Sequence, residues 1–334
     1  MIIDVHGHFV ATEVLERLRR EGGTYGITVL DGPAGPCLRI GDEPPTPPFF
    51  PDLHDLQRRQ EHLRRTEVDL QILSPWLEMV GYTLPPPQGQ RWSRLLNDTL
   101  AREAAALASA SCYATMATVP LQDARLAAAE LEYAVTHLGY TGATLATHVA
   151  GRNLGEAGLD VFWQAAQALR APIIIHPIHI HAHELPRVQS YYLFNLASNP
   201  FETTVAATSL IFSGVVERFP DLAIILVHGG GFLPYQIGRF QQGYATRHDL
   251  LGAQNSRLPQ DCLRWFYYDT VLYSPAALRF MVEQVTSRQV VLGSDYPFPI
   301  GDFDPVRSVR EVQLGSEATQ AILGENAQTL FRLR

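Results

Sequence analysis

The sequence has few cysteines, no block of basic residues and no long apolar run. Cys37, Cys112 and Cys262 lie far apart and none belongs to a Cys-x-x-Cys pair, which indicates neither a disulfide framework nor a thiolate metal site. No apolar run approaches the ~18 residues of a membrane span, and the first residues lack a secretory-signal pattern, so we expect a cytosolic protein without a membrane partner. The net charge is −8. Nucleic acid is therefore not an expected partner.

Eight short β-rich runs alternate with helical patterns along the 334 residues. The runs are Ile2–Val5, Leu70–Leu73, Tyr113–Val119, Gly142–Thr147, Pro172–Ile175, Leu222–Val227, Phe266–Asp269 and Val290–Leu292. Continuous apolar strands such as "PIII" and "AIILV" are typical of a parallel sheet covered by helices. The pattern predicts a single-domain (β/α)8 TIM barrel over residues 1–334, with an open doubly wound sheet as the alternative.

Two long loops are expected, after strands 1 and 5, at Phe9–Pro51 and His176–Pro200. We expect the first to be irregular from about Ala11, because "GDEPPTPPFFP" has too few N–H donors for a helix. An amphipathic helix follows from Asp52. Four histidines on polar helix faces or near helix ends are expected to be solvated: His54, His62, His137 and His248.

Polar residues follow four of the predicted strands where each strand ends. His6 and His8 come at the end of the first, His176 follows "APIII", His228 follows "LAIILV" and Asp295 follows "VVLGS". His6 and His8 point the same way because side chains alternate along a strand. The C-terminal ends of barrel strands meet at one rim. Imidazole and carboxylate ligands without cysteine suit Zn²⁺ or another first-row divalent ion, so the pattern predicts a metal site at this rim.

Other motifs leave alternatives open. The histidines His179, His181 and His183 lie beyond Pro177, in a polar loop that lines the pocket mouth or faces solvent, and His148 could face the pocket. "GATLATHV" ends without a lysine, where such barrels commonly hold a carboxylated lysine between two metals, so a single ion is expected. Glycines 229–231 form either a tight turn or a place where substrate approaches the backbone. They lack the spacing of a phosphate-binding loop.

The chain resembles the amidohydrolase superfamily, in the branch of 2-amino-3-carboxymuconate-6-semialdehyde decarboxylase. The segments that carry the resemblance are "IDVHGHF", "VPLQD", "NPFETTVA", "FPDLAIILVHGGGFLPYQIGRF" and "VVLGSDYPFPIGDFDP". The resemblance implies that the metal is bound by His6, His8, His176 and Asp295. It also implies that His228 is an acid/base group, and that Arg239 grips a substrate carboxylate across the interface of a homodimer.

Two comparisons within the superfamily refine the expected function. The stretch "GDEPPTPPFF" lacks the second carboxylate-binding arginine of the namesake decarboxylase, so the namesake's own substrate is not implied. The related 4-oxalomesaconate hydratases have glutamate where this chain has Asp295, which favours decarboxylation.

The expected function is therefore metal-dependent, non-oxidative decarboxylation of an unsaturated or aromatic carboxylic acid. His228 and Asp295 are the expected catalytic groups, and one Zn²⁺, or else Mn²⁺ or Co²⁺, is the expected cofactor. The first alternative is a metal-dependent hydrolase or hydratase of a related lactone, amide or enol acid. The second alternative is a barrel that binds a metal or ligand without catalysis.

Overall fold

Eight parallel strands form one sheet at the centre of the molecule, and their order in the sheet follows the sequence. The computed structural model describes residues 1–334 except 107–111, 157, 179–184 and 334. The strands, in order, are β1 (Ile3–Phe9), β4 (Leu70–Pro75), β5 (Tyr113–Ala117), β6 (Gly142–Ala146), β9 (Ile173–His176), β10 (Ile224–Leu226), β11 (Phe266–Asp269) and β12 (Val290–Val291). All eight predicted strands are confirmed.

The last strand meets the first, which brings the sheet round into a barrel. The N–H of Val5 donates to the carbonyl of Leu292 at 2.8 Å, and the N–H of Asp295 donates to the carbonyl of His6 at 2.8 Å. Farther along, the N–H of His8 donates to the carbonyl of Tyr296 at 2.7 Å. The (β/α)8 prediction is therefore confirmed, and the open-sheet alternative is wrong.

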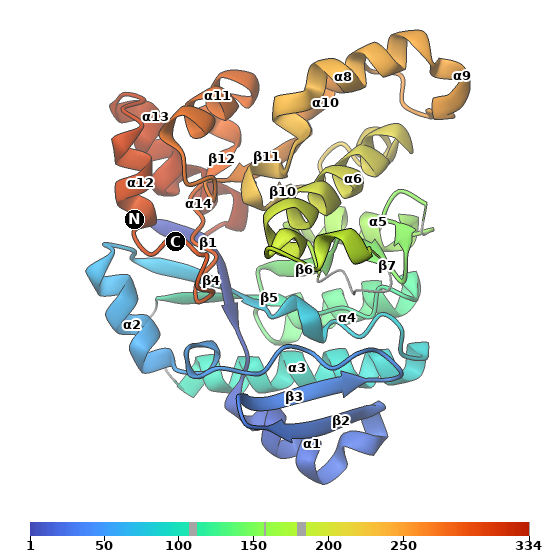
Figure 1. The fold of residues 1–334 in the computed structure, drawn as a ribbon, viewed down its shortest axis with the longest axis vertical. Coiled ribbons are helices and arrows are strands. Elements are labelled where there is room, and N and C mark those ends of the chain that lie inside the picture. Colours follow the sequence, from blue (N-terminus) through green and yellow to red (C-terminus); the bar gives the residue numbers. More distant parts are fainter. Residues whose placement is uncertain (107–111, 157, 179–184, 334) are drawn as a thin grey trace.

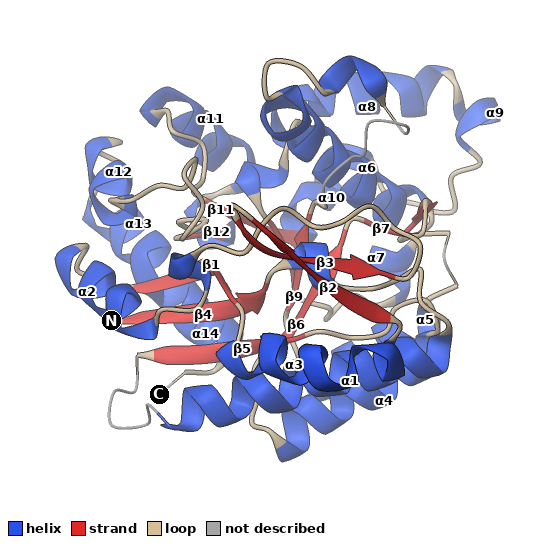
Figure 2. Ribbon diagram, turned by 60° about the horizontal axis from the view of Figure 1, so that its bottom comes forward, coloured by secondary structure: helices blue, strands red, loops and turns tan. Residues whose placement is uncertain are grey.

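Helices surround the strands, as Figure 2 shows. They are α1 (Thr12–Tyr25), α2 (Leu56–Arg65), α3 (Pro86–Ala106), α4 (Ala124–His137), α5 (Asp160–Leu169), α6 (Asn199–Phe212), α7 (Val215–Arg218), α8 (Leu233–Thr246), α9 (His248–Leu251), α10 (Pro259–Cys262), α11 (Pro275–Val285), α12 (Pro305–Glu311), α13 (Ser316–Gln320) and α14 (Asn326–Phe331). Polar side chains cap several starts; Asp123, for example, accepts from the N–H groups of Arg125 and Leu126 at α4. In Figure 1, α8 and α9 extend beyond α6 at the upper right.

The prediction of an irregular segment from Ala11 to Pro51 is wrong for its first thirty residues. Helix α1 occupies Thr12–Tyr25, and β2 (Ile27–Gly32) pairs with β3 (Gly35–Ile40) as an antiparallel hairpin. The buried residues of α1 include Val14 and Leu18, four positions apart on one helix face. Glycine disfavours both helix and strand, and α1 has two glycines near its end while β2 and β3 each contain one. The sequence pattern therefore did not indicate the helix or the hairpin. The proline-rich stretch that follows has no regular structure up to Phe50, as expected.

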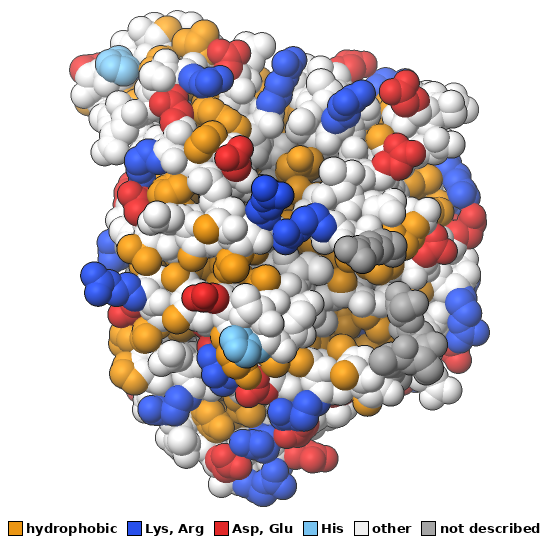
Figure 3. All heavy atoms as spheres, turned by 180° about the vertical axis from the view of Figure 1, so that it is seen from behind, with side chains coloured by type: hydrophobic (Ala, Val, Ile, Leu, Met, Phe, Trp, Pro, Cys, Tyr) orange, Lys and Arg blue, Asp and Glu red, His pale blue; other side chains and the backbone are white. Residues whose placement is uncertain are grey.

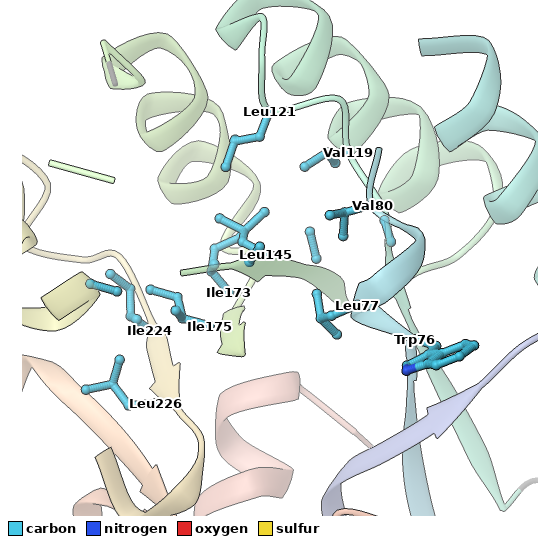
Figure 4. Packing of buried hydrophobic residues seen from close by; sticks show 14 of the residues in the cluster. Trp76, Leu77, Val80, Val119, Leu121, Leu145, Ile173, Ile175, Ile224 and Leu226 are labelled. Atoms are coloured by element: carbon cyan, nitrogen blue, oxygen red, sulfur yellow. The ribbon is translucent and has the colours of Figure 1, made fainter. Parts of the chain in front are cut away.

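Apolar side chains pack on both faces of the sheet. Ile3, Val5, Ile72, Ile174 and Ile225 belong to one buried cluster, which fills the barrel interior. Their neighbours along the strands belong to a second cluster between the sheet and the helices. Figure 4 shows part of this outer layer, including Leu145, Ile173, Ile175, Ile224 and Leu226. The alternation explains why these strands are almost entirely apolar.

The surface of the barrel carries charge of both signs. Figure 3 shows one face of the molecule, on which acidic and basic side chains are interspersed without a broad area of either sign. Across the part of the chain that the structure describes, no helix combines the length and the apolar character needed to span a bilayer.

His62 is buried, so its prediction as a solvated residue is wrong. Its ring stacks on Tyr296 with centroids 4.3 Å apart, and the guanidinium of Arg65 donates to its Nδ1 at 3.2 Å. His54 is half-buried and its Nδ1 donates to the carbonyl of Val10 at 2.9 Å, whereas His137 and His248 are exposed. His62 is buried because α2 packs against the loop after β12, where Tyr296 and Phe303 contact its ring.

The stability of the fold should depend on pH through His62. Burial first, and then the charges of Arg65 and Arg59, lower the pKa of His62 to about 4. Between that value and the usual 6.5 only the unfolded chain takes up the proton, so His62 stabilises the fold above pH 6.5 and this contribution is lost as the pH falls toward 4. We expect His62→Phe, which keeps a stacked ring, to remove up to about 3 kcal/mol of this pH dependence. Urea unfolding of metal-free protein between pH 4.5 and 7.5 measures the difference; parallel curves for the two proteins would contradict it.

Candidate active site

Four histidines and one aspartate converge at the C-terminal rim of the barrel. His6 and His8 lie on β1, His176 is the last residue of β9, His228 follows β10 and Asp295 follows β12. The candidate ligand atoms of His6, His176, His228 and Asp295 all lie within 4.8 Å of one another. The structure therefore brings together every residue that the sequence places at the rim.

The Asp295 carboxylate lies at the centre of this group. Its Oδ1 is 3.3 Å from His6 Nε2 and 3.2 Å from His8 Nε2, and its Oδ2 is 3.6 Å from His228 Nε2. The Nε2 atoms of His6 and His8 are themselves 3.1 Å apart. The His176 ring packs against the rings of His8 and His6, with centroids 4.7 and 5.1 Å away.

Hydrogen bonds on the outer side of each ring orient three of the histidines. His6 Nδ1 donates to Asp269 Oδ2 at 2.6 Å, His8 Nδ1 to the Pro75 carbonyl at 3.2 Å, and His176 Nδ1 to the Pro177 carbonyl at 2.6 Å. With Nδ1 engaged, each ring presents Nε2 to the centre. His176 Nε2 is buried and has no hydrogen-bond partner among the described residues. Inward Nε2 atoms with anchored Nδ1 atoms are the usual arrangement of metal-binding histidines, so these residues fit a divalent ion.

The electrostatics of the site also suit a cation. Burial would raise the pKa of Asp295, but the charge of His6 and the polar contacts with His228, His6 and His8 hold it well below its usual range. Burial alone would lower the pKa of His6, yet the charges of Asp295 and Asp269 raise it to about 10. Burial lowers the pKa of His8 and, further, that of His176. The site therefore combines an ionised carboxylate with two neutral imidazoles, which is a good donor set for a divalent metal.

The backbone at the two expected catalytic residues has an unusual conformation. His228 has φ 54° and Asp295 has φ 59°, in the left-handed region that few residues other than glycine adopt. Such strain is concentrated at functional sites. Next to His228, a Cβ on Gly229 would lie 2.4 Å from the Leu272 side chain. This glycine therefore serves the tight turn, and the space beside it is filled by the protein itself rather than open to substrate.

Two cavities open beside the cluster, and Asp295 lines both. The cavity on the His228 side has a volume of about 330 Å³ and is also lined by Tyr235 and Tyr273. The cavity on the His176 side has a volume of about 290 Å³, and its aromatic walls are formed by Phe50, Trp76, Tyr192, Phe194 and Phe298. These volumes are at the lower end of small-molecule sites, and the aromatic walls suit a planar ligand.

Several expected residues lie outside the cluster. Arg239 is exposed on α8 and does not line either cavity of its own chain. His148 is half-buried and lines a separate cavity with Tyr82 and Ile178. The positions of His179, His181 and His183 lie outside the described residues. Lysine is absent from the whole sequence, so a carboxylated lysine cannot bridge two ions here.

Sequence reasoning missed Asp269. This residue ends β11, and its carboxylate accepts from His6 Nδ1 and from the N–H of Gly229 at 2.8 Å. It thus orients a proposed ligand and the turn after His228 at the same time. The signal was present, because Asp269 is a polar residue at the end of a predicted strand, as are the other members of the site.

A family model described as amidohydrolase matches residues 3–333. The chain belongs to the amidohydrolase family. Among relatives, it is 32% identical over 270 residues to 2-amino-3-carboxymuconate-6-semialdehyde decarboxylase of Dictyostelium discoideum, covering 80% of this chain and 74% of the relative. It is 31% identical to 6-methylsalicylic acid decarboxylase of Penicillium expansum, and the match covers 88% of this chain and 84% of the relative.

The same fold occurs in solved structures of decarboxylases. A dihydroxybenzoic acid decarboxylase from Polaromonas sp. JS666, crystallised with manganese and the inhibitor 2-nitroresorcinol, superposes with a TM-score of 0.80 at 24% identity, covering 99% of this chain and 97% of that one. The family model and the curated relatives confirm the superfamily resemblance, and the solved structure shows the same fold.

Proposed function

We propose that the protein is a metal-dependent decarboxylase of an aromatic or unsaturated carboxylic acid. The observation that carries the proposal is the group of inward-facing Nε2 atoms around the buried Asp295 carboxylate, beside two aromatic-lined cavities. The relatives named above are decarboxylases of carboxymuconate and salicylate types, which supports the same chemistry for this chain.

The metal would be held by His6, His8, His176 and Asp295. Zn²⁺, Mn²⁺ and Co²⁺ all accept imidazole and carboxylate ligands, and the decarboxylase from Polaromonas holds manganese. When bound, the ion supplies a Lewis acid that withdraws electron density from the coordinated substrate. Only one ion is proposed, because the chain has no lysine to form a carboxylated bridge.

His228 and Asp295 would carry the proton transfers. Both residues line the cavity on the His228 side, and His228 Nε2 lies 3.6 Å from Asp295 Oδ2. In the proposed reaction the bond between the carboxylate carbon and the carbon that bears it breaks, and CO₂ leaves with the carboxylate carbon. The electron pair of that bond then takes up a proton from the protonated His228 ring, directly or relayed through the Asp295 carboxylate, and solvent returns the proton to His228. Imidazole suits this role because it gains and loses a proton near neutral pH.

The cavity walls favour a planar acid with one charged group. The ring of Phe298 contacts Phe50 edge-on and Trp76 at a tilt, and all three rings line the cavity on the His176 side. No arginine lines either cavity within the described residues. A second carboxylate would therefore meet no cationic side chain of the same chain in these cavities, so its desolvation would be costly unless another copy of the chain supplies the cation.

Removal and restoration of the metal test the proposal. We expect dialysis against a chelator to abolish turnover of a hydroxybenzoate-type acid, and one equivalent of Mn²⁺, Zn²⁺ or Co²⁺ per chain to restore it. Product analysis then separates the reactions. Water added to the substrate, or hydrolysis of a lactone or amide, would assign the same site to a hydratase or hydrolase, and turnover unaffected by the chelator would contradict the proposal.

We further propose that the protein acts as a homodimer in which Arg239 of one copy serves the other copy. Arg239 is exposed on α8, which extends away from its own barrel in Figure 1, and the exposed apolar side chains of Leu196 and Phe232 line the cavity on the His228 side. We expect Arg239→Ala to raise KM about tenfold or more while kcat changes less, because charged hydrogen bonds of this kind contribute about 1.5–3 kcal/mol. A monomer by light scattering, or an unchanged KM, would contradict this proposal; Arg307→Ala, an exposed arginine on α12, is the control.

A further inference from the structure

A chain of buried polar side chains connects helix α2 to the strand that carries His6 and His8. It consists of Arg59 on α2, Gln71 on β4 and Asp4 on β1, and all three are at most 1% exposed. None of them lines either cavity beside the cluster. The reaction proposed above gives none of them a role.

The Arg59 side chain hydrogen-bonds to the backbone of β1. Its Nη2 donates to the carbonyl of His8 at 2.5 Å, and its Nη1 donates to Gln71 Oε1 at 2.6 Å. The guanidinium carbon lies over the ring of Tyr296, 4.7 Å from its centroid. No carboxylate among the described residues forms an ion pair with Arg59.

Gln71 connects Arg59 to β1. Its amide nitrogen donates to Asp4 Oδ2 at 2.6 Å, while its amide oxygen accepts from Arg59, so the orientation of the amide is determined at both ends. The side chain lies against Gly7, where an added Cβ would be 2.5 Å from the Gln71 Cδ. This contact explains the glycine between the two histidines: Gln71 occupies the space that any other side chain at position 7 would need.

Asp4 extends the chain of hydrogen bonds to the seam of the barrel. Its Oδ1 accepts from the N–H groups of His6 and Ser294, both at 3.0 Å. Its Oδ2 accepts from Ser294 Oγ at 2.6 Å as well as from Gln71. Ser294 directly precedes Asp295. These three side chains therefore hydrogen-bond to the backbone of His6, His8 and Ser294.

We propose that Arg59 and Gln71 are positioning residues, which act through Asp4 and the backbone of β1 to set the spacing of His6, His8 and Asp295 for the metal. The inference rests on the proposed function for its ligands, but it assigns a role to residues that touch neither metal nor substrate. A buried arginine without an acidic partner is costly to desolvate, and an apolar side chain of similar volume is often tolerated equally well. The contacts that Arg59 makes are to the backbone of a ligand and to the amide that supports it, which is where such a group can tune a metal site.

Metal affinity of Arg59→Met measures the role directly. Methionine fills a similar volume without charge or donors. We expect the Kd for Mn²⁺, measured by calorimetry, to rise about 10- to 100-fold. We also expect the visible absorption bands of the Co²⁺-loaded variant to shift, because the ligand geometry changes. Arg59→Lys keeps the charge but replaces the two nitrogens that reach His8 and Gln71 separately by a single ammonium nitrogen, so we expect an intermediate Kd.

A matched control separates positioning from general stability. Arg94→Met also removes an arginine from a polar network, since Arg94 donates to the buried Glu130 at 2.8 Å, but this pair joins α3 to α4 away from the site. We expect it to lower the Tm with a Kd for Mn²⁺ within twofold of the wild type. If Arg59→Met lowers the Tm while its Kd and Co²⁺ spectrum match those of wild type, the inference is wrong. If Arg59→Met does not fold, the Kd and spectrum of Arg59→Lys decide in the same way.

The outcomes also distinguish this inference from the proposed function. Wild-type protein that binds no Mn²⁺ or Co²⁺ would overturn the metal site and the positioning role together. Wild-type protein that binds the ion but releases no CO₂ would overturn only the decarboxylase proposal, since the affinity difference between wild type and Arg59→Met would remain. Equal affinities in a protein that does release CO₂ would overturn only the positioning role.

Discussion

Replacing His228 by glutamine should abolish turnover while leaving the metal bound. Glutamine has a similar length and can hydrogen-bond, but it cannot gain or lose a proton near neutral pH. His228 faces the cavity, its Nε2 lies 3.6 Å from Asp295 Oδ2, and its Nδ1 has no hydrogen-bond partner among the described residues. Acid/base groups of this kind contribute roughly 10²- to 10⁴-fold, so we expect kcat to fall by about 10³-fold or more. Steady-state kinetics with metal analysis of the purified variant measures both quantities.

The metal content decides how a loss of activity is interpreted. His228 also lies within 4.8 Å of the other candidate ligands, so a variant that loses the metal would make His228 a ligand rather than the acid/base group. Turnover within tenfold of wild type would remove it from the chemistry altogether. His137→Gln, the same substitution at an exposed position on α4, should leave both kcat and metal content unchanged.

Asp295→Asn should lower metal affinity and turnover together. The change is nearly isosteric, but it removes the negative charge that His6, His8 and His228 surround. Residues that only support a ligand already contribute 10- to 100-fold to metal affinity. We therefore expect the Kd for Mn²⁺ to rise by at least about 100-fold, and kcat to stay about 10³-fold below wild type even at saturating metal, because the amide cannot transfer a proton.

Titration calorimetry and kinetics at several Mn²⁺ concentrations separate the two effects. Activity that returns to the wild-type level at high Mn²⁺ would leave Asp295 as a ligand without a part in proton transfer. An unchanged Kd would contradict its place in the metal site. Asp304→Asn serves as the control, because Asp304 is an exposed carboxylate in the same segment of chain after β12.

The rim residues could be predicted because their positions follow from local pattern. Runs such as "APIII" and "LAIILV" mark strands that are buried on both faces, and a polar residue directly after such a run lies at the rim of a parallel barrel. His176 and His228 were found in this way, and the structure places them beside His6 and Asp295. The prediction needed no knowledge of long-range contacts, since the barrel topology brings all strand ends together.

The residues that support the rim could not be predicted in the same way. Arg59 belongs to the amphipathic helix α2, and the charged residues of such a helix are expected on its solvated face. Arg59 is nevertheless fully buried, because its side chain reaches the backbone of β1 at His8. Gln71 interrupts an apolar strand at a position whose importance depends on the register of β1 with β4. His62 was assigned to solvent for the same reason as Arg59. Tertiary packing decided these three cases, and a single sequence carries little information about it.

The most direct test of decarboxylation is CO₂ release by the metal-loaded protein in D₂O, from salicylate-, resorcylate- and carboxymuconate-type acids labelled with ¹³C in the carboxyl group. The proposed function predicts one labelled CO₂ per molecule of product, with one deuterium on the carbon that carried the carboxylate, and neither from chelator-treated protein. Product that retains the labelled carboxyl group and has gained the elements of water would contradict it.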